Sequence, residues 1–99
     1  MAKMYVLVRS DLSKSQQAVQ GGHAVAEYLL KYKPLKWDNG TMVYLSIHPD
    51  DFMGWRDELS RLEVIQPYSV FSEPDLDYQA TAIAVICETD ALFDREVLL

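Results

Sequence analysis

Two segments of this 99-residue sequence gather the side chains that general acid–base chemistry uses. The segment SDLSKSQQ (residues 10–17) contains Asp11 and Lys14, and it leads into a stretch that holds His23. The segment EPDLDYQAT (residues 73–81) supplies further polar side chains: Glu73, Asp75, Asp77, Tyr78 and Thr81. In open α/β sheets, ligands bind where loops follow the carboxyl ends of the strands. We therefore expect a cationic loop and an acidic loop to face each other across a cleft, provided that the strands before them lie side by side.

The elements that must position these loops are strands and helices in alternation. Apolar runs rich in β-branched residues predict four strands, over residues 4–8, 42–47, 64–72 (starting after Pro67) and 81–87. Apolar residues at helical spacing predict one helix over residues 15–32 and a second that begins at the His48-Pro49 pair. In the first helix we expect the stripe toward the core to comprise Ala18, Val25, Leu29 and Tyr32.

The resulting order is β-α-β-α-β-β, with a possible short helix within residues 90–99. Such alternation requires crossover connections, so at least part of the sheet should be parallel. The length suits one domain over residues 1–99. The sequence thus predicts a single α/β domain in which a four-stranded mixed sheet is flanked by helices.

Two adjacent glycines lie inside the first predicted helix, in AVQGGHAVAEYLL (residues 18–30). Each glycine costs about 1 kcal/mol relative to alanine in a helix interior. We expect Gly21 and Gly22 to allow a close approach of the helix backbone to its neighbours or to a substrate. On this interpretation Gly22→Val damages the site or its packing, although it improves the helix propensity.

Composition excludes several protein classes. With 49% apolar and 24% charged residues, the chain has the balance of a globular protein. No apolar run approaches the roughly 20 residues that span a bilayer, and the start lacks a signal-peptide core. The only cysteine, Cys87, lies in the apolar run TAIAVIC, as expected for a buried thiol in a reducing compartment. We expect a cytoplasmic protein without membrane association.

The charge is unevenly distributed along the chain. Residues 1–36 carry six basic and two acidic side chains, whereas residues 37–99 carry three basic and thirteen acidic ones, within a total net charge of −6. Such asymmetry can mark a nucleic-acid-binding face on an acidic protein. The alternative is that the lysines form only a solvated helix end.

Metal and phosphate-loop motifs are absent from the sequence. One cysteine and two histidines in unrelated contexts give no zinc-ligand spacing, and Gly21-Gly22 lies within a helix rather than between a strand and a helix. The sequence also lacks a G-x-S-x-G elbow. We expect neither a metal nor an organic cofactor.

The segment YVLVRSDLSKSQQAVQGGHAVAEYLL (residues 5–30) resembles the start of the peptidyl-tRNA hydrolases of the second type, a family of archaea and eukaryotes with bacterial and phage relatives. The family has an apolar strand, D-L, a lysine-bearing loop and a helix with Q-x-x-H-A. Here these elements are Asp11-Leu12, Lys14 and the segment Gln20 to Ala24. The family's K-G-K loop is Lys14-Ser15-Gln16, and EPDLDYQATAIAV replaces its D-A-G-x-T segment. The chain is thus similar to a short, divergent member.

The resemblance implies hydrolysis of the ester that joins a stalled peptide to the 3′ ribose of tRNA. This chemistry needs an activated water, a group that stabilises the oxyanion and a basic surface for phosphates. We assign Lys14 to the oxyanion or the terminal phosphate and Asp75 to water positioning, and we add His23 and Thr81 to the catalytic residues. The expected substrate-binding residues are Asp11, Gln20 and Tyr78, with Tyr78 stacking on the terminal base.

Two alternatives remain at the level of the sequence. The absence of the second loop lysine favours a non-catalytic binding module that retains the fold. A third possibility is an esterase that acts on a smaller acyl ester without tRNA. As the family tends to dimerise, we also expect a homodimer.

Overall fold

The computed structural model describes residues 2–33, 37–62, 67–88, 93 and 96–99. Its elements follow one another as β1 (Lys3–Arg9), α1 (Lys14–Lys31), β2 (Met42–Ile47), α2 (Pro49–Arg61), β3 (Tyr68–Glu73), the 3₁₀ turn η1 (Pro74–Leu76), β4 (Gln79–Cys87) and β5 (Val97–Leu98). This order confirms the predicted β-α-β-α-β-β arrangement of an α/β fold, including the start of the third strand directly after Pro67.

The strands form one mixed sheet in the order β3-β4-β1-β2-β5. The central strand β1 pairs in parallel with β2 and antiparallel with β4, and β4 pairs antiparallel with β3. β5 adds two residues to the outer edge of β2, a strand that the sequence did not predict. Of the segment where a short closing helix was considered possible, residues 89–92 and 94–95 lie outside the described part of the chain, and residues 97–98 are strand.

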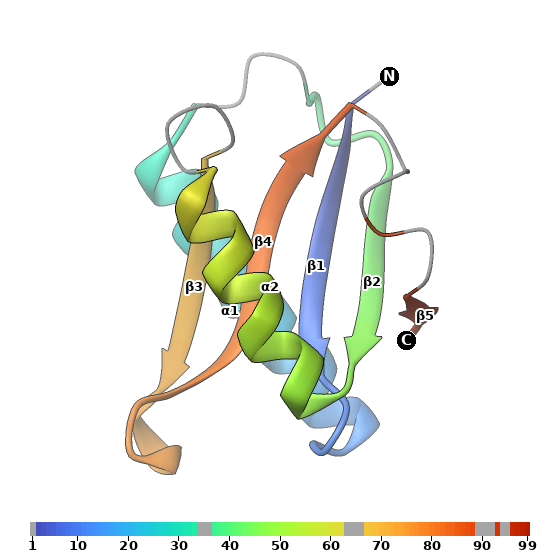
Figure 1. Ribbon diagram of the computed structural model, residues 1–99. Helices are drawn as coiled ribbons and strands as arrows, with labels where there is room; N and C mark the ends of the chain where they lie inside the picture. Colours follow the sequence, from blue (N-terminus) through green and yellow to red (C-terminus); the bar gives the residue numbers. More distant parts are fainter. Residues whose placement is uncertain (1, 34–36, 63–66, 89–92, 94–95) are drawn as a thin grey trace.

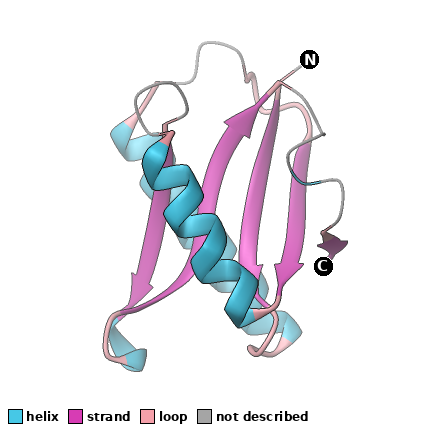
Figure 2. Ribbon diagram, in the orientation of Figure 1, coloured by secondary structure: helices cyan, strands magenta, loops and turns pink. Residues whose placement is uncertain are grey.

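Each face of the sheet is covered by one helix, α2 in front and α1 behind in Figure 1, and the three layers are distinct in Figure 2. Alternation along β1 separates two cores, because successive side chains of a strand point to opposite faces. Tyr5 and Leu7 face α2 and pack with Phe52 and Leu59. On the other face, residues 4, 6 and 8 pack with α1 through Ala24 and Tyr28.

Helix α1 turns a different side toward the sheet than its apolar residues predict. Ala18 and Leu29 are exposed, Leu29 by 46%, so this part of the predicted stripe is wrong. The side chains and glycine that are buried are Gln17, Gln20, Gly21, Ala24 and Tyr28. Two glutamines can occupy a buried face because every amide end has a hydrogen-bond partner, as described below.

The two adjacent glycines have different surroundings. A Cβ atom added to Gly21 would overlap the ring of Tyr44 on β2 and lie 2.9 Å from Cγ1 of Val6 on β1. A Cβ atom added to Gly22 would meet nothing within 4 Å. The close approach of the helix to the sheet therefore requires Gly21, and the expectation that Gly22 serves intramolecular packing is wrong.

Two further expectations concern membranes and the cysteine. Among the described helices, none is long and apolar enough to cross a membrane. Cys87 is buried in the core beneath α2, as predicted, and this burial raises the pKa of its thiol to about 11.

Candidate functional site

The two segments singled out in the sequence lie at the same end of the sheet. The carboxyl ends of β1, β2 and β3 point to this end, where α1 and β4 begin (Figure 1). The strands before the two segments, β1 and β3, are however not adjacent, because β4 lies between them. The two loops therefore do not face each other directly, as neighbouring strands would require. Instead, residues of α1 and β4 make the hydrogen bonds that connect this end of the sheet.

A buried chain of hydrogen bonds links α1, β4 and β3 at this end. The Thr81 hydroxyl donates to Oε1 of Gln20 at 2.5 Å, and Nε2 of Gln20 donates to Oε2 of Glu73 at 3.1 Å. Thr81 is fully buried and Gln20 is 3% exposed, whereas Glu73 is half-buried. We call these three residues the Thr81–Gln20–Glu73 chain. Both donors point toward the carboxylate, which is the one member with access to solvent.

A β-bulge in β4 orients Thr81. The register pairs Phe71 with Ala82 and Ser72 with Ala80, so Thr81 is an additional residue without an opposite partner on β3. Ala80 packs in the core beneath α2 and Ala82 in the core beneath α1. The extra residue lets Thr81 point toward α1 as Ala82 does, which is how bulges re-aim a side chain.

His23 lies one turn after Gln20 on α1, and its ring is stacked on Phe71. The ring centroids are 4.4 Å apart with an interplanar angle of 15°. Phe71 and Glu73 are two residues apart on β3 and therefore face the same side of the sheet. The exposed His23 ring and the Glu73 carboxylate thus lie on one continuous surface, formed by α1 and β3.

Burial changes the roles of two predicted site residues. A side chain with no exposed surface cannot touch a substrate, so Thr81 is not placed for a direct catalytic role. Gln20 was expected to bind substrate, yet both ends of its amide are occupied by protein partners. In this structure, Thr81 and Gln20 position Glu73.

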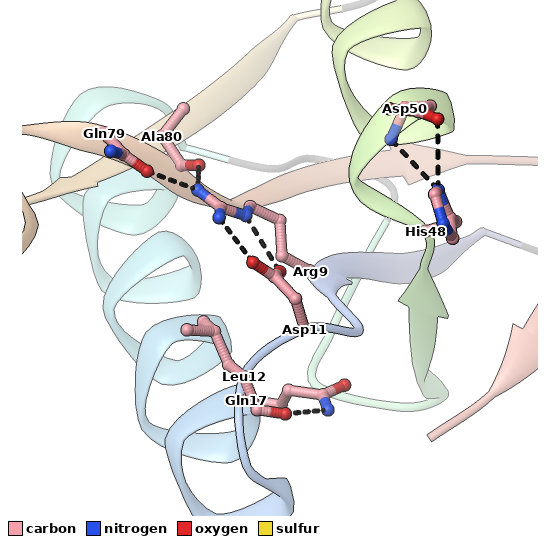
Figure 3. Close-up of polar contacts among 8 residues, drawn as sticks. All are labelled: Arg9, Asp11, Leu12, Gln17, His48, Asp50, Gln79 and Ala80. Carbon is pink, nitrogen blue, oxygen red and sulfur yellow. Dashed lines mark hydrogen bonds and ion pairs between the residues drawn. The ribbon is translucent and has the colours of Figure 1, made fainter.

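Asp11 is paired with Arg9 rather than open to a ligand (Figure 3). Nε and Nη2 of Arg9 donate to the two carboxylate oxygens of Asp11 at 3.0 and 2.6 Å, and Nη1 donates to Oε1 of Gln79 at 3.0 Å. Hydrogen bonding by Arg9 is the main cause that lowers the pKa of Asp11. Because Arg9 also donates to Gln79, its guanidinium fastens the loop after β1 to the start of β4.

The side-chain amide of Gln17 also holds the loop that follows β1. Nε2 of Gln17 donates to the carbonyl oxygen of Leu12 at 2.7 Å (Figure 3), and its Oε1 accepts from the Ser46 hydroxyl at 2.8 Å. Ser13 caps α1 by accepting from the backbone N–H of Gln16 at 3.2 Å. The start of α1 is therefore fixed by three independent contacts.

Lys14 lies on a different side of α1 from His23. Nine residues at about 100° each separate the two positions, which places them about 180° apart around the helix. Lys14 is exposed at the first residue of α1. The geometry does not bring these two predicted catalytic residues together.

Asp75 and Tyr78 belong to the turn between β3 and β4. Asp75 is exposed in η1, and within the described part of the chain its carboxylate makes no hydrogen bond or ion pair. Asp77 and Tyr78 both have left-handed backbones, with φ of 54° and 60°, an uncommon conformation for two successive non-glycine residues. The backbone N–H of Tyr78 donates to the carbonyl oxygen of Glu73 at 2.9 Å, and Tyr78 is 71% exposed. The turn thus presents an exposed aromatic ring on the segment that follows Glu73.

The second histidine has a structural role. Nδ1 of His48 accepts from the backbone N–H of Asp50 at 3.2 Å and caps α2 (Figure 3). In the described residues, no group of three or more His, Cys, Asp or Glu side chains is arranged to hold a metal ion.

No protein-family model and no curated protein matches this sequence. Among solved structures, the chain is similar to Atu0240, a protein of unknown function from Agrobacterium tumefaciens strain C58. The superposition has a TM-score of 0.73 and covers 99% of this chain and 97% of the other, at 11% sequence identity. At this identity the likeness extends to the fold alone.

The sequence favours a solvated carboxylate at Glu73 and indicates only a strand residue at Phe71. In the structure Glu73 is half-buried and accepts from Gln20, and Phe71 stacks on the ring of His23. Their alternation on β3 was visible as a signal, since residues 71 and 73 must share one face. Their partners on α1 are 48 and 53 residues away in sequence, so no local pattern connects them.

Proposed function

We propose that this chain hydrolyses the ester bond between a peptide or N-acylated amino acid and the 3′ ribose of tRNA. The observation that carries the proposal is that exposed His23 stacks on Phe71, on the same face of β3 as Glu73, whose carboxylate accepts from a buried hydrogen-bond chain. Ester hydrolysis needs a group that activates water and a group near the developing charge, and a carboxylate and an imidazole are suited to these tasks. The acidic segment 73–77 supplies the water-activating group in this proposal.

The basic first third of the chain supports an RNA substrate. Lys14 and Lys31 are the exposed first and last residues of α1, roughly 26 Å apart at 1.5 Å per residue. Two lysines at this spacing can contact phosphates that lie several nucleotides apart on a nucleic acid, with affinity that falls as salt increases. The open ring of Tyr78 offers a stacking surface for the terminal base. The proposed setting is the cytoplasm, and the proposed assembly is a homodimer.

One observation favours a second candidate function. Lys14 lies opposite His23 around α1, so the groups expected to act on one ester do not converge fully. A protein that binds RNA through its lysines without cleaving it would need no such convergence. A non-catalytic binding module is therefore the alternative, and an esterase for a smaller acyl ester is the third candidate.

The decisive experiment incubates purified protein with N-acetyl-aminoacyl-tRNA in the presence of EDTA and follows the release of free tRNA. We expect release that His23→Ala lowers at least tenfold, while His48→Asn, which retains a cap for α2, leaves it unchanged. Tight tRNA binding without release would establish the binding module instead. Turnover of an acyl-adenosine ester without turnover of tRNA would establish the smaller substrate.

A further inference from the structure

We infer that Glu73, rather than Asp75, is the catalytic carboxylate that activates the attacking water. This inference rests on the proposed function and names the residue that performs its central step. It follows from the buried Thr81–Gln20–Glu73 chain, because burying a hydroxyl and an amide costs free energy.

The chain is directed at Glu73 from the interior. Burying a hydroxyl and an amide costs free energy unless each polar atom finds a partner. Here the Thr81 hydroxyl and the Gln20 amide satisfy each other, and the remaining Nε2 donor of Gln20 is used on Oε2 of Glu73. A bulge in β4 is needed to bring Thr81 into this position. The arrangement fixes the Glu73 carboxylate in one orientation.

Glu73 is also accessible where Thr81 and Gln20 are not. Oε2 of Glu73 is occupied by Gln20, while Oε1 has no hydrogen-bond partner among the described residues. A half-buried carboxylate with one oxygen fixed and the other open can accept a proton from a water at the surface shared with His23. Asp75 lacks such support, since it lies in the exposed turn beyond the strand.

The proposed step balances without any further reactant. Oε1 of Glu73 takes a proton from water as the water oxygen bonds to the ester carbonyl carbon, forming a tetrahedral oxyanion. When this intermediate collapses, the bond from carbon to the 3′ oxygen breaks. Glu73 returns the proton to the departing 3′ oxygen, so the products are the free acyl carboxylic acid and tRNA with a 3′ hydroxyl.

The test compares Glu73→Gln with Asp75→Asn in the deacylation of N-acetyl-aminoacyl-tRNA, with pH–rate profiles for both. Glutamine has the shape of glutamate and keeps an oxygen that accepts from Gln20, so we expect the variant to fold. Its melting temperature checks this expectation. We expect Glu73→Gln to lower kcat about 100-fold or more, the range of a general base, with KM unchanged and the acid limb of the profile lost. Asp75→Asn should lower kcat far less than Glu73→Gln does and should keep the acid limb of the profile.

The possible results separate the two claims. A wild-type protein that releases tRNA, together with a Glu73→Gln variant that keeps its rate and acid limb, overturns the role of Glu73 and leaves the proposed function standing. A large loss in Asp75→Asn alone moves the role to Asp75. A wild-type protein that hydrolyses neither the tRNA ester nor an acyl-adenosine ester overturns the function and the inference together.

Discussion

Both faces of the central sheet bury an apolar cluster, but among the described residues only the face beneath α1 also buries polar side chains. Beneath α2, the buried cluster is almost entirely apolar, with Phe52 and Leu59 of the helix against Leu7 and Ile83 of the strands. Beneath α1 lie the buried polar side chains of the described residues: Gln17, Gln20, Ser69 and Thr81. Each of them has a hydrogen-bond partner, for example Ser69, whose hydroxyl donates to the carbonyl oxygen of Ala24 at 2.7 Å.

The difference indicates that the polar side chains of the α1 face do more than stabilise the domain. Apolar burial stabilises a fold without directing any one side chain, at about 25 cal/mol per Å². Buried hydrogen bonds contribute little net stability but fix the orientation of the groups that they join. We infer that apolar burial on both faces holds the domain together, and that the buried polar side chains of the α1 face in addition orient Glu73 and the start of α1.

The largest expected effect on stability comes from the α2 face. Phe52 is fully buried, so Phe52→Ala should lower the free energy of unfolding by about 3–5 kcal/mol through lost burial and a cavity. The neighbouring Met53 is half exposed, and Met53→Ala should change it by less than about 0.5 kcal/mol. Urea denaturation measures both values. Equal losses in the two variants would show that the burial of Phe52 beneath α2 does not stabilise the domain as described.

The adjacent glycines of α1 give the next test. A Cβ atom at position 21 would collide with Tyr44 and Val6, so Gly21→Ala should destabilise the protein by about 1–3 kcal/mol. At position 22 the space is open, and Gly22→Ala should stabilise it by up to about 1 kcal/mol through helix propensity. Thermal melts of the two variants decide the point. If both alanines shift the melting temperature in the same direction, the packing of α1 against β1 and β2 is not as described.

Thr81 tests the buried hydrogen bonds on their own. Thr81→Val leaves Oε1 of Gln20 without its donor in the interior, which should cost about 1–3 kcal/mol. Thr81→Ser keeps the hydroxyl and should recover part of that loss, although it removes a methyl group. Chemical denaturation of both variants measures the difference. A valine variant more stable than the serine variant would contradict the need for the hydroxyl.

The smallest effect concerns the ion pair at the edge of the site. The pKa of Asp11 is lowered in the folded state, so its stabilising contribution is present above the unfolded pKa of about 3.9 and is lost as pH falls through the lower, folded value. The Asp11 side chain is 41% exposed, and solvent screening limits the contribution to less than about 1 kcal/mol. Asp11→Asn should therefore be slightly less stable than the wild type at pH 7. The gap should close in strong acid, and a gap that widens there would exclude the pair as its cause.

The strands β1 to β4 were predictable because their residues carry the information locally, whereas the two-residue strand β5 was not. The apolar run of β1 predicts a buried central strand, and the alternation of elements predicts that the loops at residues 10–17 and 73–81 meet at one end of the sheet. The buried side of α1 was not predictable in this way, because Gln17 and Gln20 are buried only through partners on β2, β3 and β4. The bulge at Thr81 likewise depends on the register between two strands.

The most direct test of the division between the faces uses two residues of β4. Thr81 faces α1 and Ile83 faces α2, they are two residues apart, and both are fully buried. The measurement is the rate of N-acetyl-aminoacyl-tRNA deacylation per folded molecule, in Thr81→Val and Ile83→Val. We expect a loss of at least tenfold in Thr81→Val and an unchanged rate in Ile83→Val. Equal rates in the two variants, whether both retained or both lost, would contradict a role of the buried Thr81–Gln20–Glu73 chain in orienting the catalytic carboxylate.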